Sequence, residues 1–315
     1  MSTTDAEDTI KVLFLGLDNA GKSSIIVSLR REFSRLADLK PTRGVQIRTF
    51  NFLGMKISEW DLGGQRLYRK VYMKTRHERT FGGTEIAIYI IDAQDSSRME
   101  ENLEYLQGIV NQFRLLEITP PLYVFFHKFD PVDIIGSQVE VNNYSLELRN
   151  KIKETVHYPN MSFYRTSIYD LKTIIIAMSK ILLSRNPKAI VLEEVIKEFA
   201  YKLESEGLEI IDDNSLIIGS YYKNEQTKNL MNSVTPLFFF FFDILERAEV
   251  KVPYSEEIEE HNDEMLIRRF QRYFLFKKFR IGAEGTYFYF LGCKKDAAFH
   301  REDLDTFIQL IKESI

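Results

Sequence analysis

Apolar positions in the first 186 residues occur in short runs that alternate with longer amphipathic stretches. The runs favour buried strands, because a strand covered on both faces reads as a nearly continuous apolar segment. Between them, apolar residues recur at helical spacing, as Ile25, Ile26 and Leu29 do within a predicted helix at 24–35. The predicted strands are 11–15, 46–52, 55–60, 85–91, 122–126 and 162–164. This alternation predicts an α/β domain with a mainly parallel six-stranded sheet and helices on both faces.

The order of elements changes after an amphipathic helix predicted at 171–183. We therefore place a domain boundary before Pro187, giving domains at 1–186 and 187–315. Turn-forming residues at 212–214 and 282–285 favour two hairpins in an α+β second domain. Its predicted helices are 191–206, 225–248 and 301–315; its predicted hairpins pair 208–211 with 216–222 and 270–281 with 286–291; and 250–253 is a further candidate strand.

Five consecutive phenylalanines, at 238–242, lie in the predicted helix 225–248. The uncharged stretch between Lys228 and Asp243 is too short to span a membrane, which takes roughly 20 apolar residues. Two interpretations remain. The helix is either buried within its own domain, or it has one face in the domain and another against a partner domain. In the second case the contact is predicted at Leu230, Leu237, Phe238, Phe241 and Leu245, with an adjoining sheet edge.

The composition of the chain indicates the number of cores it can form, its cellular compartment and a difference in net charge between its two parts. The chain has 315 residues, of which 44% are apolar and 28% charged, which is enough for two cores. Its single cysteine, Cys293, excludes intramolecular disulfides and suits a reducing, cytoplasmic compartment. The polar, acidic start and the Met1-Ser2 beginning predict no direct membrane anchor. Residues 1–186 carry 25 Lys and Arg against 22 Asp and Glu, whereas the remainder carries 17 against 24.

The segment 16–23 fits the phosphate-binding pattern G-x-x-x-x-G-K-[ST] and falls between a predicted strand and a predicted helix. Its backbone N–H groups are expected to surround the phosphates of a nucleotide at a helix N-terminus. Lys22 is expected to bridge the terminal phosphates, and the Ser23 hydroxyl to be a ligand of Mg²⁺. The predicted phosphate contacts are Asp18, Asn19, Ala20, Gly21, Lys22, Ser23 and Ser24.

Two later segments are expected to act on the terminal phosphate. The segment 60–65 contains D-x-x-G-Q after a predicted strand. The Asp61 carboxylate can hold the metal through water, the Gly64 N–H can reach the γ-phosphate, and the Gln65 amide can orient an attacking water. The other segment is the loop that contains Thr42, which precedes 60–65 in the chain. Thr42 can close on Mg²⁺ when the γ-phosphate is present. The predicted metal ligands are Ser23, Thr42 and Asp61, and the predicted catalytic residues are Gln65, Lys22 and Thr42.

Two segments after predicted strands are expected to recognise the base. The first is His127-Lys128-Phe129-Asp130 and the second is Thr166-Ser167-Ile168. A carboxylate such as Asp130 can accept from both the ring N–H and the exocyclic amine of guanine, whereas adenine offers no such pair of donors on that edge. We therefore expect GTP or GDP as the nucleotide. The predicted base contacts are His127, Lys128, Asp130, Ser167 and Ile168.

These segments, in this order, resemble the small GTPases of the Ras superfamily. GLDNAGKSS and WDLGGQ are similar to the Arf-like branch, whereas HKFD, FYRTSIYD and IYIIDAQD resemble the Rag/Gtr GTPases, as does the length of the chain. The Rag/Gtr resemblance implies that strand 46–52 is an antiparallel edge and that 187–315 is a roadblock/longin-like dimerisation domain. It also implies a homologous GTPase subunit as partner, in a homodimer or heterodimer, with activating proteins, exchange proteins and effectors at the switch regions.

Two features predict slow GTP hydrolysis. Asp18 places a carboxylate near the γ-phosphate, where it cannot stabilise negative charge, and no arginine finger can be assigned within the chain. The resemblance implies that a partner protein supplies activation, and the signalling function follows from that switch. His127 replaces the commoner asparagine and removes an amide that ties the base loop to the phosphate loop, a contact that the imidazole can replace.

The same residues bear on other possible functions. A scaffold that holds guanine nucleotide as a structural cofactor remains an alternative, although Gln65 and Thr42 argue against it. A P-loop kinase would leave the guanine motif unexplained. The basic residues between 268 and 280 lie in an acidic domain without an RNA-binding signature, so nucleic acid is not an expected partner. The basic residues between 66 and 79 are either a docking surface for an acidic protein or a solvated helix face.

Overall fold

The computed structural model describes residues 9–135, 137–249, 264–269, 271–281, 286–296 and 299–314, with the backbone alone for 240–249 and residue 301. The chain divides into two compact units. One is formed by Met1–Ser28 with Glu32–Ile174, and the other by Leu29–Arg31 with Ile175–Ile315. The division falls within helix α7 (Leu171–Leu183). The predicted boundary at 186 lies a few residues beyond it and stays a prediction.

The first unit contains a six-stranded sheet with the strand order β2-β3-β1-β4-β5-β6. All neighbouring pairs are parallel except β2 with β3, which are antiparallel. The predicted mainly parallel sheet is therefore confirmed, with its antiparallel edge at β2. The strands are β1 (Thr9–Gly16), β2 (Val45–Phe52), β3 (Met55–Leu62), β4 (Ile86–Asp92), β5 (Leu122–His127) and β6 (Met161–Arg165).

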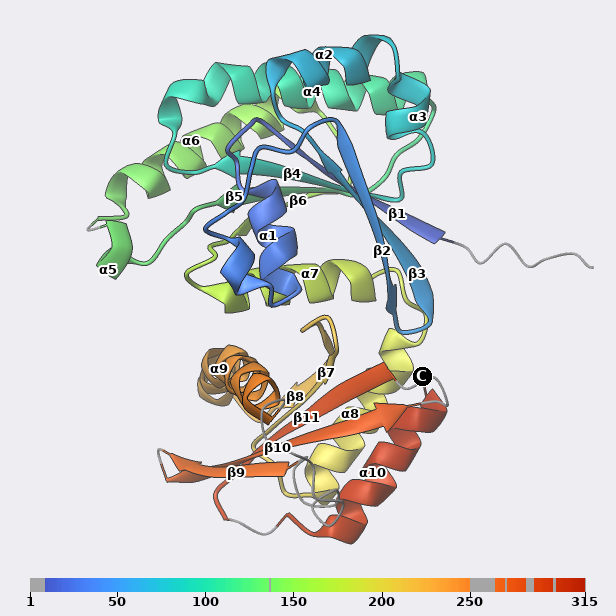
Figure 1. The fold of residues 1–315 in the computed structure, drawn as a ribbon, viewed down its shortest axis with the longest axis vertical. Helices are drawn as coiled ribbons and strands as arrows, with labels where there is room; N and C mark the ends of the chain where they lie inside the picture. Colours follow the sequence, from blue (N-terminus) through green and yellow to red (C-terminus); the bar gives the residue numbers. More distant parts are fainter. Residues whose placement is uncertain are drawn as a thin grey trace, which may run out of the picture. The chain divides into compact units, whose positions relative to one another are not determined.

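Helices cover both faces of this sheet. Figure 1 shows α2, α3, α4 and α6 along one face and α1 along the other. Tyr89 and Ile91 of β4 belong to the core cluster that includes Ile109 and Phe113 of α4. Because β4 is covered on both sides, its residues 86–91 are all buried, which explains the unbroken apolar run in the sequence. The helices are α1 (Lys22–Leu29), α2 (Arg66–Lys74), α3 (His77–Phe81), α4 (Met99–Leu115), α5 (Val132–Ile135) and α6 (Val139–Val156), with 3-10 turns η1 (Phe33–Arg35) and η2 (Ser96–Arg98).

The second unit contains a five-stranded antiparallel sheet with the order β8-β7-β11-β10-β9. Both predicted hairpins are present, as β7 with β8 and β10 with β11. Strand β9 was not predicted; the candidate strand at 250–253 and the turn at 282–285 lie outside the described residues. The elements are α8 (Ala189–Lys202), β7 (Gly207–Asp212), β8 (Ile217–Tyr222), α9 (Glu225–Glu249), β9 (Glu264–Arg269), β10 (Arg272–Ile281), β11 (Thr286–Lys294) and α10 (Arg301–Ser314).

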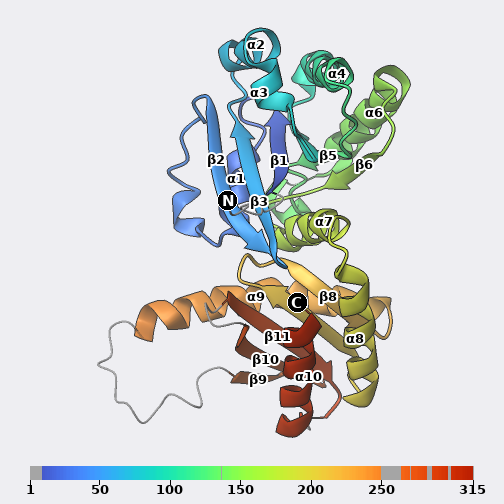
Figure 2. The ribbon, with the colours of Figure 1, turned by 90° about the vertical axis from the view of Figure 1, so that its right-hand side faces the viewer.

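Helices lie on opposite faces of this sheet (Figure 2), and neighbouring aromatic residues of β11 contact them. Successive side chains of a strand point to opposite faces. The ring of Tyr289 lies 5.1 Å from that of Phe239 on α9, whereas the ring of Phe290 lies 5.8 Å from that of Phe307 on α10. The sheet is therefore covered by α9 on one face and by α10 on the other, and α10 in turn packs against α8.

The phenylalanine run contributes to the core of its own unit. Phe238 is 4% exposed and stacks on Phe276 of β10 at 4.9 Å, whereas Leu237 is 66% exposed. The interface predicted to include Phe238 therefore needs correction at that residue, because its ring is already buried within the unit. The side chains of Phe241 and Leu245 lie outside the described residues. Among the helices that the structure describes, none is long and apolar enough to cross a membrane.

Helices α1 and α8 end earlier than the predicted ranges 24–35 and 191–206. Two residues after each helix ends, a residue adopts the left-handed conformation, Arg31 with φ 57° and Glu204 with φ 53°. In both cases the N–H of the next residue donates to the carbonyl five residues back, at 3.1 and 2.8 Å. This closure usually uses glycine. Apolar periodicity continued past both ends without a glycine, so the sequence pattern gave no signal to stop.

Candidate functional site

The loop between β1 and α1 requires glycine where it leaves the sheet. Gly16 has φ 140°, and a Cβ there would lie 2.2 Å from the carbonyl oxygen of Ile90 on β4. The loop closes around Lys22, whose ammonium donates to the carbonyl oxygens of Gly16 at 3.1 Å and Leu17 at 2.7 Å. Burial lowers the pKa of Lys22 to about 8. An anion beside this ammonium would favour its charged form.

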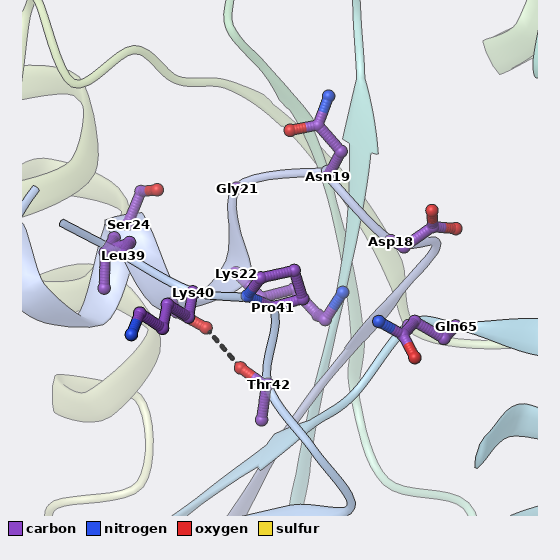
Figure 3. Close-up of a pocket in the computed structure, with 12 residues that line it drawn as sticks. Asp18, Asn19, Gly21, Lys22, Ser24, Leu39, Lys40, Pro41, Thr42 and Gln65 are labelled. Carbon is purple, nitrogen blue, oxygen red and sulfur yellow. Dashed lines mark hydrogen bonds between the residues drawn. The ribbon is translucent and has the colours of Figure 1, made fainter. Parts of the chain in front are cut away.

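A cavity of about 220 Å³ opens on this loop (Figure 3). The figure shows the Lys22 and Gln65 side chains directed toward the same space, beside Asp18. Ala20 is buried in the loop, 2% exposed, and is the one predicted phosphate contact that does not line the cavity. The other lining residues bring the phosphate loop together with both predicted switch segments: Asn19, Gly21, Ser23, Ser24, Leu39, Lys40, Pro41, Thr42 and Gly64.

The three predicted metal ligands converge at one side of this cavity. Ser23 Oγ donates to Asp61 Oδ2 at 2.6 Å, and Thr42 Oγ1 donates to the same oxygen at 3.1 Å. The two hydroxyl oxygens are 2.8 Å apart. Asp61 Oδ1 is buried without a hydrogen-bond partner. Two hydroxyls and a carboxylate with an unused acceptor are the hard oxygen ligands that Mg²⁺ prefers, so these residues fit the ion that a nucleotide phosphate requires.

Close contacts join the second predicted switch segment to the phosphate loop and to the first predicted switch segment. A Cβ at Gly64 would lie 2.3 Å from the backbone nitrogen of Asp18, so only glycine allows this approach. The Gly63 N–H donates to the carbonyl of Gly44 at 2.9 Å, and the Tyr72 hydroxyl donates to the same oxygen at 2.7 Å. Gln65 precedes α2 and is exposed, with its side chain free to reach the cavity.

An arginine that the sequence analysis missed contacts the phosphate loop. Arg98, in η2, donates to Asp18 Oδ1 at 2.8 Å and to the Asp18 carbonyl at 3.1 Å. Burial alone would raise the pKa of the Asp18 carboxyl, but the hydrogen bond and positive charge of Arg98 outweigh it and hold the pKa below its usual value. Glu101 accepts from Arg98 at 2.8 Å and also pairs with Arg69 of α2. No local pattern marks these residues, because Arg98 and Asp18 are 80 positions apart.

The predicted base contacts lie at the carboxyl ends of β5 and β6, as expected for a ligand of a parallel sheet. Asp130 is 6% exposed, and its Oδ1 accepts from the Ser167 hydroxyl at 2.5 Å. Its Oδ2 accepts from Gln94 Nε2 at 2.7 Å, and Gln94 Nε2 also donates to the Lys128 carbonyl at 2.9 Å. Ile168 follows Ser167 and is half-buried. The contact from Gln94 was not predicted.

His127 and Lys128 are each held by a neighbour. Lys128, with φ 59°, places its ammonium 2.6 Å from Asp92 Oδ2 at the end of β4. His127 Nδ1 lies 3.0 Å from Thr166 Oγ1, and a Cβ at Gly21 would lie 2.3 Å from His127 Cδ2. The imidazole therefore packs directly on the phosphate loop and takes the connecting place of the commoner amide. Burial and the Lys128 charge lower the pKa of His127 to about 3, so the ring is neutral at pH 7.

Two curated relatives of this chain are ADP-ribosylation factor-like proteins. The chain is 37% identical to the ADP-ribosylation factor-like protein alp41 of Schizosaccharomyces pombe over 110 residues, which are 35% of this chain and 55% of that protein. It is 32% identical to the ADP-ribosylation factor-like protein 3 of Chlamydomonas reinhardtii over 131 residues, 42% of this chain and 69% of that protein. The match to alp41 thus spans about half of that protein's length.

A solved structure and a family description complete the comparison. The Arl6 BBS3 small GTPase from Trypanosoma brucei, with bound nucleotide analogue GppNp, is similar with a TM-score of 0.42 and 17% identity, over 55% of this chain and 95% of that chain. The family model described as "Gtr1/RagA G protein conserved region" matches residues 11–246, which are most of the chain and extend well into the second unit. This chain therefore belongs to the Rag/Gtr-type small GTPases of the Ras superfamily.

Proposed function

We propose that this protein is a guanine-nucleotide switch that binds GTP or GDP with Mg²⁺, hydrolyses GTP slowly and acts in signalling as a dimer. The carrying observation is the convergence of Ser23, Thr42 and Asp61 around one carboxylate oxygen beside the Lys22 loop. These residues come from three separate segments of the chain, and a loop with a solely structural role does not require hydroxyl and carboxylate groups to meet in this way. Asp61 Oδ1 is buried without a hydrogen-bond partner, and this free acceptor supports binding of a hydrated cation.

Each of the proposed residue roles follows from chemistry at a stated atom. Mg²⁺, when bound, would neutralise the charge that develops on the transferred phosphoryl group. Ser23 and Thr42 would hold it by their hydroxyls and Asp61 through water. Lys22 Nζ would move from the loop carbonyls to the terminal phosphate oxygens, and the Gln65 amide would orient the attacking water.

Slow hydrolysis is supported by the charges around the cavity. Among the described residues that line it, lysines are the only cationic type and arginine is absent. Arg98, the arginine that reaches the phosphate loop, is engaged with Asp18 and Glu101. A GTPase without an arginine on the transferred phosphate loses a large part of its rate. We therefore propose that a partner protein supplies activation.

Two measurements separate the switch from a scaffold that keeps its nucleotide permanently. A native mass spectrum of the purified protein should show one guanine nucleotide and Mg²⁺ per chain. Single-turnover hydrolysis of GTP should then be slow yet measurable, with exchange of the bound nucleotide in excess GTP and EDTA. A bound nucleotide that neither exchanges nor turns over would support the scaffold instead, and equal affinity for ATP and GTP would contradict both functions.

We also propose that the domain at 187–315 pairs with a homologous domain, of the same chain or of a paralogue. The two edges of its sheet support this, because an edge strand presents unpaired backbone groups to another chain. At one edge, β9 exposes Leu266 by 49% and Ile267 by 40%. On α9, Leu237 is 66% exposed and Leu230 is half-buried, and both stay in the proposed interface. Buried Phe238 is not retained.

Light scattering on the full chain tests self-pairing. At tens of micromolar we expect twice the chain mass of 37.0 kDa. Leu237→Ser should weaken pairing, whereas Leu146→Ser, a control at a 55% exposed position of α6, should not. A monomeric wild type would restrict the partner to a paralogue. Failure to recover any homologous GTPase with the protein from its own cells would then refute the dimer.

A further inference from the structure

The phosphate loop carries a negative charge at an unfavourable place. Asp18 lines the same cavity as Lys22, Thr42 and Gln65, the residues proposed to act on the terminal phosphate. Its side chain is 46% exposed. Two like charges at contact distance repel by about 1 kcal/mol even in bulk water, and by more near a protein surface. An unpaired carboxylate here would therefore oppose a triphosphate more than a diphosphate.

Arg98 holds Asp18 at two points, the carboxylate and the backbone carbonyl. One amino group of its guanidinium lies 2.8 Å from Asp18 Oδ1, and the other lies 3.1 Å from the Asp18 carbonyl oxygen. The third nitrogen, Nε, donates to Glu101 Oε2 at 2.8 Å. Each of the three guanidinium nitrogens therefore has an acceptor, which limits the positions that the group can take. A planar fork of this kind loses less freedom per hydrogen bond than a lysine would.

The chain of charges continues to the second switch segment. Glu101 also pairs with Arg69, and Arg69 Nε donates to the carbonyl of Gly64 at 2.8 Å. Asp18, Arg98, Glu101 and Arg69 alternate in sign, so the network is neutral as a whole. It connects the phosphate loop to the residue just before Gln65. Loss of its central arginine would leave Asp18 with an uncompensated charge facing the cavity.

We propose that Arg98 is a positioning residue that pairs with Asp18 and thereby sets the affinity for GTP relative to GDP. This inference rests on the proposed guanine-nucleotide switch. Arg98 acts through Asp18, and Asp18 acts on the phosphoryl group that GTP has and GDP lacks. The preference for GTP over GDP should therefore depend on the pair, whereas the affinity for GDP alone should depend on it much less.

A double-mutant cycle tests the coupling. Dissociation constants for GDP and for a non-hydrolysable GTP analogue, both with Mg²⁺, are measured for the wild type, Arg98→Ala, Asp18→Ala and the double variant. Arg98→Ala should lower the GTP:GDP affinity ratio roughly three- to tenfold, the range of a partly exposed charge pair. Asp18→Ala should raise the ratio. The double variant should match Asp18→Ala, because Arg98 then has no carboxylate to pair with.

Further variants separate positioning from a general loss of structure. Arg98→Lys should restore part of the ratio, since it keeps the charge and loses the two-point grip. Arg149→Ala, an exposed arginine on α6, is the matched control and should leave the ratio unchanged. Raising the salt concentration should shrink the effect of Arg98→Ala, because screening weakens the repulsion that it exposes.

Three outcomes would overturn the inference. In the first, Arg98→Ala weakens both nucleotides equally, which indicates a structural role. In the second, the double variant has a lower ratio than Asp18→Ala, which indicates that Arg98 acts on the nucleotide directly. The third outcome applies if Arg98→Ala does not fold: an Asp18→Ala variant whose GTP:GDP affinity ratio equals that of the wild type. A wild type that binds no guanine nucleotide would instead refute the proposed function itself.

Discussion

Replacing Asp130 by asparagine should convert the preferred base from guanine to xanthine. The carboxylate oxygens accept from the Ser167 hydroxyl at 2.5 Å and from Gln94 Nε2 at 2.7 Å, so both neighbours are donors. Asparagine has one acceptor and one donor. If its oxygen keeps the bond from Ser167, its NH₂ group faces Gln94 Nε2. Gln94 cannot turn its own oxygen inward without losing the bond to the Lys128 carbonyl at 2.9 Å.

The magnitude follows from the bonds that change. Guanine can offer a carboxylate two charge-assisted hydrogen bonds, each worth about 1.5–3 kcal/mol. Asparagine keeps one acceptor but not the negative charge, so one bond is lost and the other falls to about 0.5–1.5 kcal/mol. This predicts a weakening of roughly 2.5–4.5 kcal/mol, or about 10²–10³ in the dissociation constant of GDP. Xanthine replaces the exocyclic amine with a carbonyl, which can accept from the new NH₂ group. XDP should therefore bind the variant at least as well as GDP does.

Competition titration against a fluorescent GDP, with GDP and XDP as competitors, measures both constants. Asp133→Asn, at an exposed position of α5, is the control and should keep the wild-type preference. An unchanged GDP:XDP ratio in a folded Asp130→Asn protein would refute the assignment of this carboxylate to the base.

The remaining predictions concern turnover and pH. Gln65→Leu should retain GTP and slow single-turnover hydrolysis by an order of magnitude or more. Ser23→Asn should favour GDP or lose nucleotide, because it disturbs the proposed Mg²⁺ ligand. A wild-type rate for Gln65→Leu would show that another group orients the water. Nucleotide affinity should fall as pH rises through about 8, where Lys22 loses its proton before a nucleotide binds, and Lys22→Met should abolish that dependence in calorimetric titrations. The folded pKa of His127, about 3, is below its unfolded value, so the unfolded chain binds more protons between that pH and about 6.5, and the free energy of unfolding should fall as pH decreases across this window. Denaturant unfolding of His127→Asn should lack this one-proton component, and an identical pH slope would contradict a buried neutral imidazole.

The sequence indicated which candidate site residues would lie together wherever a residue is found at the end of a predicted strand. Residues of this kind include Asp61 near the end of β3 and Asp130 after β5, and a parallel sheet gathers such positions at one edge. Glycines in the motifs were equally informative. Gly16 and Gly64 approach other backbone segments so closely that no side chain fits, and this constraint is visible as a pattern.

Contacts between distant side chains could not be predicted. Gln94 reaches Asp130 across 36 positions, and Arg98 reaches Asp18 across 80. Neither contact leaves a periodic trace, because each depends on where the loop after β4 lies in three dimensions. The early ends of α1 and α8 were missed for a different reason. Arg31 and Glu204 adopt a backbone conformation that glycine usually marks, and the packing of the whole unit compensates for its local cost.

The contact between His127 and Gly21 means that the two halves of the nucleotide site are mechanically joined. A ring that fills the space beside the phosphate loop transmits any displacement of that loop to the end of β5, and the reverse holds equally. The loop that holds the phosphates and the loop that reads the base therefore move together or hardly at all. We therefore expect a protein that displaces one of these loops to displace the other as well.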